Sequence, residues 1–333
     1  MPVQTLLIPD ILRSWPWPRH INPNYAICKK GSSTWCEAFN AFDAKGQKAF
    51  NLSDFNLLAS LAYPLLDKDG CRVGCNWMNF VFLVDDHTDL SNTETARKQR
   101  NILMDALRNP HTPRPPNEWV GGEVARQFWE NAIRTVTPSA QRRFLDAFQH
   151  FINSVVQQAA DREATYIRDV DSYMLVRRGT IGAKPAFVLC EMHMNIPDDI
   201  MEHPVVVRLS ELCIDAIIIS NDLCSYNVEQ ARGDDEHNLV TIVMNQYRMD
   251  VQDAMNWIGD LHGKIVEEFM ETWRTMPTFG GPVDREIRTY LDGVANWVRA
   301  NDSWNYENER YFGKGGEEGM RKRSVGLLPK RKQ

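Results

Sequence analysis

The chain has 333 residues, of which 43% are hydrophobic and 25% are charged, which is ordinary for a globular protein and sufficient for one large domain. Its formal net charge of -6 argues against nucleic-acid binding, because such proteins normally present a basic surface. If the substrate is a polyanion, the counter-charge must come from a few arginines or from metal ions.

The cysteines and the N-terminus indicate a reducing compartment. Seven cysteines are present, and Cys71 and Cys75 lack the second pair or nearby histidine that a zinc site needs. The N-terminal run MPVQTLLIPD is interrupted by Pro and Asp, unlike a signal peptide. No apolar run reaches the roughly 20 residues of a membrane span. We therefore expect a cytoplasmic protein without a membrane span.

Helical periodicity recurs along most of the chain, and strand-like alternation is scarce. The first expected helix runs from a cap at Asn51 or Ser53 to Tyr63. The later helices are expected over residues 73–89, 122–136, 139–162, 171–193, 205–231, 241–276 and 284–311. This pattern predicts an all-α fold.

Two segments modify this pattern. Gly179, Gly182 and Pro185 predict a break within the helical stretch 171–193. The four prolines of residues 108–119 exclude a continuous helix, but the apolar helices on both sides need a common core. We therefore expect one domain over residues 1–313, followed by a flexible basic tail over residues 314–333.

The first acidic cluster follows an apolar run. In FVFLVDDHTDL, Asp85 and Asp89 are four residues apart, so they project from one face of a helix. Two like charges at this spacing repel each other unless a cation lies between them, and carboxylate oxygens suit Mg²⁺ or Mn²⁺. The alternative is a solvated acidic helix end, which opposes the helix dipole.

A second polar stripe lies within a later apolar helix. In NDLCSYNVE, Asn221, Ser225 and Glu229 are spaced four residues apart, which places an amide, a hydroxyl and a carboxylate in one column. These oxygen ligands can chelate a hard divalent ion together with water or phosphate oxygens. A helix that merely becomes polar at the surface explains polar residues in general, but not this set at this spacing.

These two motifs resemble the aspartate-rich and NSE/DTE metal motifs of class I terpene synthases, and the surrounding text is similar to fungal, basidiomycete-type sesquiterpene synthases. The resemblance extends from WPWPRHINPNY to NERYFG. It implies a helical bundle around a central apolar cavity. It also implies that about three Mg²⁺ ions neutralise the diphosphate of the substrate.

The resemblance implies further residues for the diphosphate. The family has an arginine about 45 residues upstream of the second metal motif, with a helix break close behind it. Spacing to Gly182 favours Arg178, with Arg177 as the alternative. Arg310 and Tyr311 resemble the C-terminal RY pair of the family, which hydrogen-bonds diphosphate oxygens.

Aromatic faces can stabilise a carbocation without reacting with it. Phe82 and Trp304 match family positions for this role. Trp77, Phe80 and Phe187 are further candidates, although packing in the core is the simpler interpretation of each.

Two positions depart from the family pattern. Asp86 stands where many relatives have Glu, which leaves open whether Asp86 or Asp89 contacts metal directly. Val228 stands where some relatives have Lys, so a cation sometimes found there is missing. No DxDD string is present, which argues against cyclisation started by protonation.

The sequence therefore favours a sesquiterpene synthase, monomeric or homodimeric, that uses Mg²⁺ to ionise farnesyl diphosphate and cyclise the cation. The N-terminal half resembles relatives that close a 1,11 bond to a humulyl cation, sometimes continuing to protoilludene. One alternative is a chain-elongating prenyltransferase, although such enzymes usually carry two DDxxD motifs. Others are a helical binding protein without metal dependence and a metal-dependent phosphohydrolase, for which no HD or HxxE cluster is present.

Overall fold

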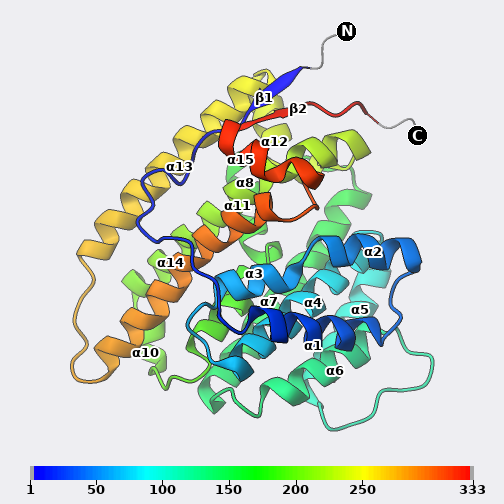
Figure 1. Ribbon diagram of the computed structural model, residues 1–333, viewed down its shortest axis with the longest axis vertical. Coiled ribbons are helices and arrows are strands. Elements are labelled where there is room, and N and C mark those ends of the chain that lie inside the picture. Colours follow the sequence, from blue (N-terminus) through cyan, green and yellow to red (C-terminus); the bar gives the residue numbers. More distant parts are fainter. Residues whose placement is uncertain (1–3, 331–333) are drawn as a thin grey trace.

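The computed structural model describes residues 4–330, and its regular structure is almost entirely helical (Figure 1). The α-helices are α1 (Tyr25–Glu37), α2 (Ala44–Leu52), α3 (Phe55–Ala62), α4 (Lys68–Thr88), α5 (Thr93–Arg108), α6 (Gly121–Ala132), α7 (Pro138–Glu163), α8 (Val170–Thr180), α9 (Ala183–Val188), α10 (Asp198–Met201), α11 (Pro204–Arg232), α12 (Leu239–Tyr247), α13 (Val251–Arg274), α14 (Val283–Glu307) and α15 (Gly316–Lys322). Short 3-10 helices are η1 (Leu189–Glu191), η2 (Asp235–His237) and η3 (Gly313–Gly315), and the strands are β1 (Thr5–Leu7) and β2 (Ser324–Gly326). The predicted all-α class is confirmed.

Capping side chains fix the starts of the helices that carry the site. Asp67 accepts a hydrogen bond from Gly70 N and starts α4 five residues before the predicted boundary. Asp54, not Asn51 or Ser53, caps α3, by accepting from Leu57 N. The predicted break is confirmed at Gly182, whose φ of 73° separates α8 from α9.

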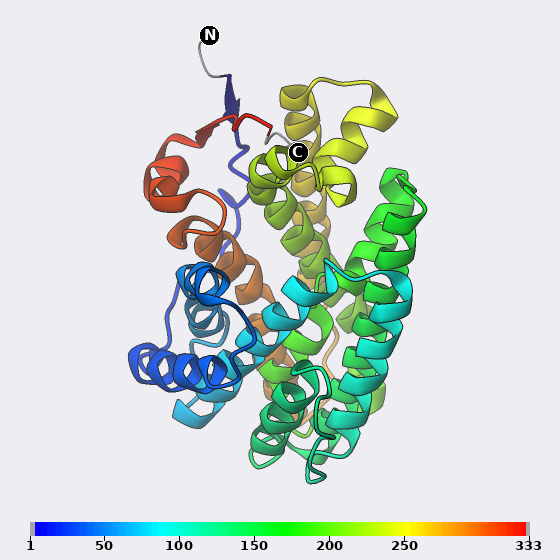
Figure 2. The ribbon, with the colours of Figure 1, turned by 90° about the vertical axis from the view of Figure 1, so that its right-hand side faces the viewer.

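The long helices surround a central space. Helix α11 packs against α14 and α13, α4 packs against α3 and α1, and α3 also contacts α14. Helix α7 contacts both α8 and α9 and closes the other side. Figure 2 shows these helices as a bundle in which α4, α7, α11 and α14 all run beside the interior. No helix among residues 4–330 is long and apolar enough to cross a membrane.

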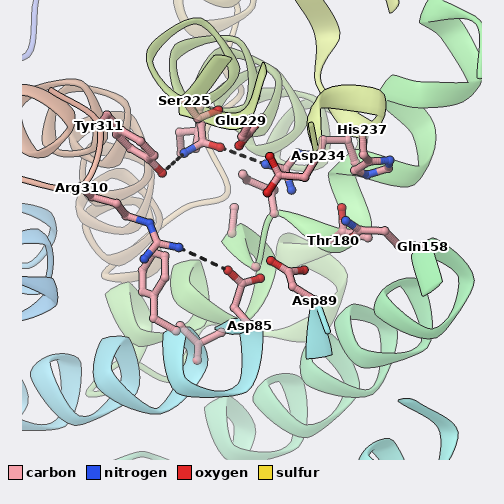
Figure 3. A pocket seen from close by; sticks show the side chains of 18 of the residues that line it. Asp85, Asp89, Gln158, Thr180, Ser225, Glu229, Asp234, His237, Arg310 and Tyr311 are labelled. Atoms are coloured by element: carbon pink, nitrogen blue, oxygen red, sulfur yellow. Dashed lines mark hydrogen bonds and ion pairs between the residues drawn. The ribbon is translucent and has the colours of Figure 1, made fainter. Parts of the chain in front are cut away.

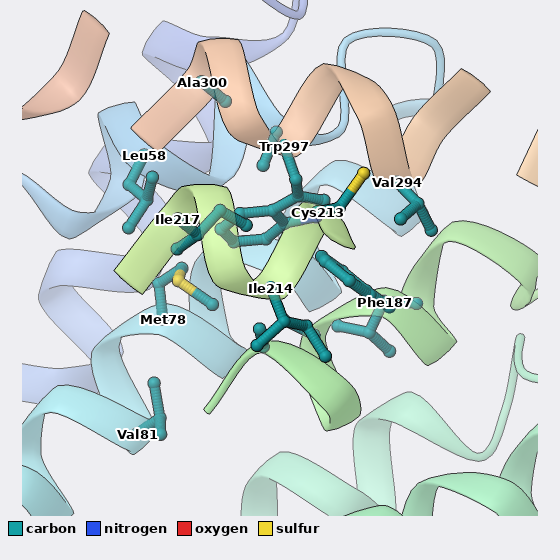
Figure 4. Close-up of a cluster of buried hydrophobic side chains, with 14 of the residues drawn as sticks. Leu58, Met78, Val81, Phe187, Cys213, Ile214, Ile217, Val294, Trp297 and Ala300 are labelled. Atoms are coloured by element: carbon teal, nitrogen blue, oxygen red, sulfur yellow. The ribbon is translucent and has the colours of Figure 1, made fainter. Parts of the chain in front are cut away.

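One hydrophobic core cluster extends along the chain from Leu6 to Trp304. Its densest aromatic part contains Trp77, whose ring centroid is 5.2 Å from that of Phe144, and Phe80, which stacks on Phe128 at 5.3 Å. Each buried aromatic side chain contributes roughly 1.5–3 kcal/mol through apolar burial. Figure 4 shows a second part of this core, where side chains of α3, α4, α9, α11 and α14 converge.

The C-terminal segment differs from the expected flexible tail over residues 314–333. Its described part, residues 314–330, forms α15 and β2, and β2 pairs antiparallel with β1. Asn227 and Gln230 on α11 donate to the carbonyls of Gly326 and Leu328 at 2.9 and 2.8 Å. The composition misled the prediction because long-range contacts order this segment; residues 331–333 lie outside the described residues.

Candidate active site

A cavity of about 490 Å³ opens between α4, α7, α8, α11 and α14. We call its two parts the polar end, lined by Asp85, Asp89, Asn221 and Glu229, and the apolar end. The apolar end is lined by Leu58, Met78, Val81, Ala186, Ile217 and Trp297. Figure 3 shows carboxylate, hydroxyl and guanidinium groups facing one another across the polar end.

The first acidic motif lies at the C-terminal end of α4, as the sequence predicts. Asp85 belongs to its last turn, Asp89 follows it, and both line the cavity. The Asp85 side chain is 40% accessible, but this surface faces the hollow. Burial there and the neighbouring Asp89 charge raise the pKa of Asp85 to about 8, against the opposing effect of Arg310. The charged form of Asp85 is therefore disfavoured here unless a positive charge lies close to it.

The second motif lies across the cavity on α11. Asn221, Ser225 and Glu229 all line it, which confirms that they share one helix face. Asn238, which caps α12, donates to Ser225 Oγ at 3.2 Å and to Glu229 Oε2 at 2.8 Å. Burial and the nearby Asp222 charge raise the pKa of Glu229 to about 7. The two motifs thus form opposite walls of one site.

Arg177, the alternative in the sequence prediction, lines the cavity at the polar end. Its Nη2 donates to Asn221 Oδ1 at 2.9 Å and lies 3.5 Å from Asp222 Oδ1. Asp222 is also held by the Tyr173 hydroxyl and by Leu239 N at 3.0 Å. Helix α8, the second motif and the start of α12 are therefore joined through one buried carboxylate.

The expectation for Arg178 is corrected. Its Nε and Nη2 each donate to Asp215 at 2.7 Å, and its side chain is absent from the cavity lining. Successive residues of a helix point about 100° apart, and here Arg177 is directed into the cavity whereas Arg178 is directed toward Asp215. Spacing to Gly182 did not reveal which of the two faces inward.

Arg310 and Tyr311 connect the two motifs. Arg310 Nη2 lies 3.3 Å from Asp86 Oδ1 and 3.9 Å from Asp85 Oδ2. Asn221 Nδ2 donates to the Tyr311 hydroxyl at 3.0 Å. Figure 3 shows Arg310 directed at Asp85 and Tyr311 beside the α11 wall. The pair follows α14, which ends at Glu307 and not at Tyr311 as expected from the sequence.

Two of the predicted aromatic side chains line the cavity and three do not. Phe82 stacks on Phe55 at 3.9 Å, and the Trp304 indole is fixed by donation from Nε1 to Ser53 O at 2.8 Å. Trp77, Phe80 and Phe187 are absent from the lining and belong to the hydrophobic core, as the simpler interpretation proposes.

Several lining residues escaped the sequence analysis. His237 on η2 and Thr180 at the end of α8 each have a buried polar atom without a partner among the described residues. Arg162 donates from α7 to the carbonyls of Thr88 and Ser91 and holds the end of α4. These residues lie in loops or at helix ends, where no periodic pattern marks them.

A hard divalent cation fits the donor chemistry of this site. Carboxylate, amide and hydroxyl oxygens face one another from two helices. The raised pKa values of Asp85 and Glu229 reflect burial first and neighbouring carboxylates second, and a bound cation would favour the charged form of both groups. Within residues 4–330, no three His, Cys, Asp or Glu side chains converge closely enough to hold an ion alone.

Comparisons with known proteins agree with this geometry. Residues 76–268, more than half of the chain, match the model of terpene synthase family 2, C-terminal metal binding. The chain is 58% identical over 314 residues to a Delta(6)-protoilludene synthase of Hypholoma sublateritium, covering 94% of this chain and 92% of that protein. It is 50% identical to the Delta(6)-protoilludene synthase of Armillaria gallica, covering 98% and 95%, and 45% identical to sesquiterpene synthase 14 of Postia placenta, covering 98% and 93%.

Solved structures support the fold. The germacradien-4-ol synthase of Streptomyces citricolor superposes with a TM-score of 0.75 at 20% identity, covering 87% of this chain and 98% of that one. An a-eudesmol synthase superposes with a TM-score of 0.78 at 19% identity, covering 88% and 98%. At these identities, the likeness concerns the fold alone.

Proposed function

We propose that this chain, which belongs to the terpene synthase family, is a Mg²⁺-dependent sesquiterpene cyclase that converts farnesyl diphosphate to Delta(6)-protoilludene. The family and relatives at 50–58% identity make it a terpene cyclase, a lyase that releases diphosphate. The observation that carries the proposal is the pairing of two oxygen-rich walls with an apolar end in one cavity.

Asp85, Asp89, Asn221, Ser225 and Glu229 would hold the metal, and we propose three Mg²⁺ ions. When bound, these ions neutralise the diphosphate and make it a leaving group. Asn238 donates hydrogen bonds to Ser225 and Glu229, so these two side chains are held in position before a metal binds.

Arg177, Arg310 and Tyr311 would hydrogen-bond the diphosphate oxygens. Arg177 is now bonded to Asn221, and Arg310 lies beside Asp86 and Asp85. Because an arginine fork binds phosphate oxygens as well as carboxylates, these donors can exchange protein partners for the substrate. That exchange leaves Asn221 and Asp85 free as metal ligands.

The apolar end would enclose the hydrocarbon chain and exclude water. Phe82 and Trp304 are aromatic side chains near the polar end. The Trp297 side chain lines the cavity about two turns earlier on α14. Aromatic faces attract positive charge by about 2 kcal/mol or more when desolvated. We propose that they stabilise the cations that follow a 1,11 closure, and that the released diphosphate accepts the last proton.

Diphosphate release tests the role of the two walls. We expect purified protein to release diphosphate from farnesyl diphosphate with Mg²⁺, and to lose nearly all release without it. An Asn221→Ala/Glu229→Ala double variant should reduce the rate at least about a hundredfold, because two of the three proposed ligands of that wall are lost. Mutation of Asn153, an exposed residue on α7, to Ala is the control.

Rapid release by the double variant, or equal release with and without Mg²⁺, would contradict the proposed site. Formation of a longer prenyl diphosphate on addition of isopentenyl diphosphate would instead identify a chain-elongating enzyme.

A further inference from the structure

One polar side chain interrupts the apolar part of the cavity wall formed by α14. Trp297, Asn301 and Trp304 all line the cavity and follow one another at spacings of four and three residues. Asn301 is only 6% exposed. Its amide therefore lies between two tryptophans on the same helix face.

The amide nitrogen of Asn301, Nδ2, is buried and has no hydrogen-bond partner among the described residues. Two other buried asparagines of α14 differ: Asn296 donates to Leu61 O at 2.9 Å, and Asn305 donates to Ser220 Oγ at 3.3 Å. A buried amide without a partner reduces stability, so its presence needs an explanation outside the packing of the chain.

The position of Asn301 along α14 separates it from the diphosphate site. Asn305, one turn later, lies beside Ser220, the residue before Asn221 of the second metal motif. Asn301 therefore lies about one helical turn before Asn305 on α14, on the side of Trp297 and away from Asn221. Figure 4 shows the Trp297 side chain among apolar groups that include Ile217 and Met78. At this level the surroundings of the amide are aromatic and aliphatic.

The part of the substrate that lies beside Asn301 is its hydrocarbon chain. This chain interacts strongly with a polar group only while it carries a positive charge. Because no acceptor among the described residues anchors Nδ2, the amide can turn its carbonyl oxygen, the negative end of its dipole, toward such a charge. In that orientation it attracts the charge more strongly than an aliphatic side chain does. This attraction acts on a carbocation and not on the neutral hydrocarbon chain. It is strongest when the positive charge lies closest to the amide, and it therefore favours some cations over others.

We infer that Asn301 is a specificity-determining residue whose amide carbonyl stabilises one carbocation of the cyclisation and so sets the ratio of the products. The inference rests on the proposed function. It assigns the amide to the hydrocarbon part of the reaction, apart from metal binding and diphosphate release.

The test compares Asn301→Leu with Asn296→Leu. Leucine resembles asparagine in size but has no dipole. In Asn301→Leu we expect the ratio of the two most abundant hydrocarbons to change about tenfold, the change that ~1.4 kcal/mol between two competing barriers produces. Diphosphate release and the Mg²⁺ concentration for half-maximal rate should change much less. The temperature of unfolding should stay equal or rise, because an unpaired amide is removed.

Asn296→Leu is the matched control on the same helix. It loses the hydrogen bonds to Leu61 O and Ala62 O, so its unfolding temperature should fall while its product ratio stays that of the wild type. Asn301→Ala, which also removes the dipole, provides a second measurement if the leucine variant does not fold.

Hydrocarbons are measured by gas chromatography–mass spectrometry and unfolding by circular dichroism. An altered ratio in the Asn301 variant together with an unaltered ratio in Asn296→Leu supports the inference. An Asn301→Leu or Asn301→Ala enzyme with the wild-type ratio overturns it, as does an equal change in both helix variants. If the wild type forms no hydrocarbon, the proposed function itself fails, and this outcome is distinct from an unchanged ratio.

Discussion

At the scale of single residues, the two adjacent arginines of α8 have different tasks. Arg177 faces the cavity and bonds Asn221, whereas Arg178 forms a two-bond ion pair with Asp215 on another side of the helix. Asp215 is 4% exposed, so loss of Arg178 leaves a buried carboxylate without its cation. Substitution of Arg177 should therefore affect mainly catalysis, and substitution of Arg178 mainly stability.

We expect Arg177→Ala to reduce kcat/KM for farnesyl diphosphate by about 10²–10³-fold, because one diphosphate donor is lost. Arg178→Ala should lower the free energy of unfolding by about 2 kcal/mol or more and change kcat/KM by less than about tenfold. Steady-state kinetics and urea unfolding measure the two effects. A larger loss of kcat/KM in Arg178→Ala than in Arg177→Ala would return the assignment to the original expectation.

His262 on α13 predicts a pH effect on stability. It is fully buried, neither ring nitrogen has a partner among the described residues, and burial lowers its pKa to about 4. Between pH 4 and the ordinary pKa of 6.5, the unfolded chain binds a proton that the folded protein does not. The titration of His262 therefore has no effect on stability above pH 6.5, and it lowers the free energy of unfolding progressively as the pH falls from 6.5 toward 4.

In His262→Leu we expect a smaller loss of stability over this pH range, by up to about 3 kcal/mol relative to the wild type. Denaturant unfolding of both proteins at several pH values measures the difference, and the subtraction removes the titration of other groups. Parallel curves for the two proteins would show that His262 does not titrate in this way.

At the scale of helices, periodicity predicted the interiors and local chemistry decided the ends. The predicted stretch 205–231 is α11, Pro204–Arg232, almost residue for residue. The predicted helix 241–276 is instead α12 and α13, because Arg248 adopts a φ of 53° and Asp250 caps a new helix. Apolar spacing continues across such a break, so the sequence pattern does not reveal it.

The same reasoning explains what was predictable in the site. Asp85, Asn221, Ser225 and Glu229 carry a helical spacing within apolar segments, and the structure brings them to one cavity. Asn238 carries no such signal, because its role depends on how the chain folds back after α11. Which side of α8 faces the cavity also depends on tertiary packing.

Helix α11 is held on both sides. Ser225 and Glu229 face the cavity, while Asn227 and Gln230, which alternate with them, bond Gly326 and Leu328 of the C-terminal segment. Replacing Asn227 and Gln230 by Leu should lower the free energy of unfolding by about 2–4 kcal/mol, because these two buried side chains lose their hydrogen bonds to the C-terminal segment.

We also expect this double variant to need a higher Mg²⁺ concentration for half-maximal rate, because the second wall is less firmly held. Mg²⁺ titration of diphosphate release measures the effect, and Gln252→Leu, which loses its contacts with Leu7 of β1, is the control. An unchanged unfolding curve would mean that the C-terminal segment does not hold α11.

At the scale of the whole molecule, distant parts of the chain combine to make the cavity. Its walls come from α3, α4, α7, α8, α9, α11 and α14, and the chain returns after α14 to place Arg310 and Tyr311 over both motifs. The sequence predicts the chemistry of the polar end because its acidic and polar residues recur at helical spacing within apolar segments. The shape of the apolar end is set by packing between these helices, and it determines which cyclic product forms.

The most direct test is the identity of the product. Purified protein is incubated with farnesyl diphosphate and Mg²⁺, and the extract is compared with authentic Delta(6)-protoilludene by gas chromatography–mass spectrometry. The proposal predicts a dominant C15 hydrocarbon that matches the standard in retention and spectrum and is absent without Mg²⁺. A dominant product derived from another first ring closure, or no hydrocarbon at all from active, folded protein, would contradict it.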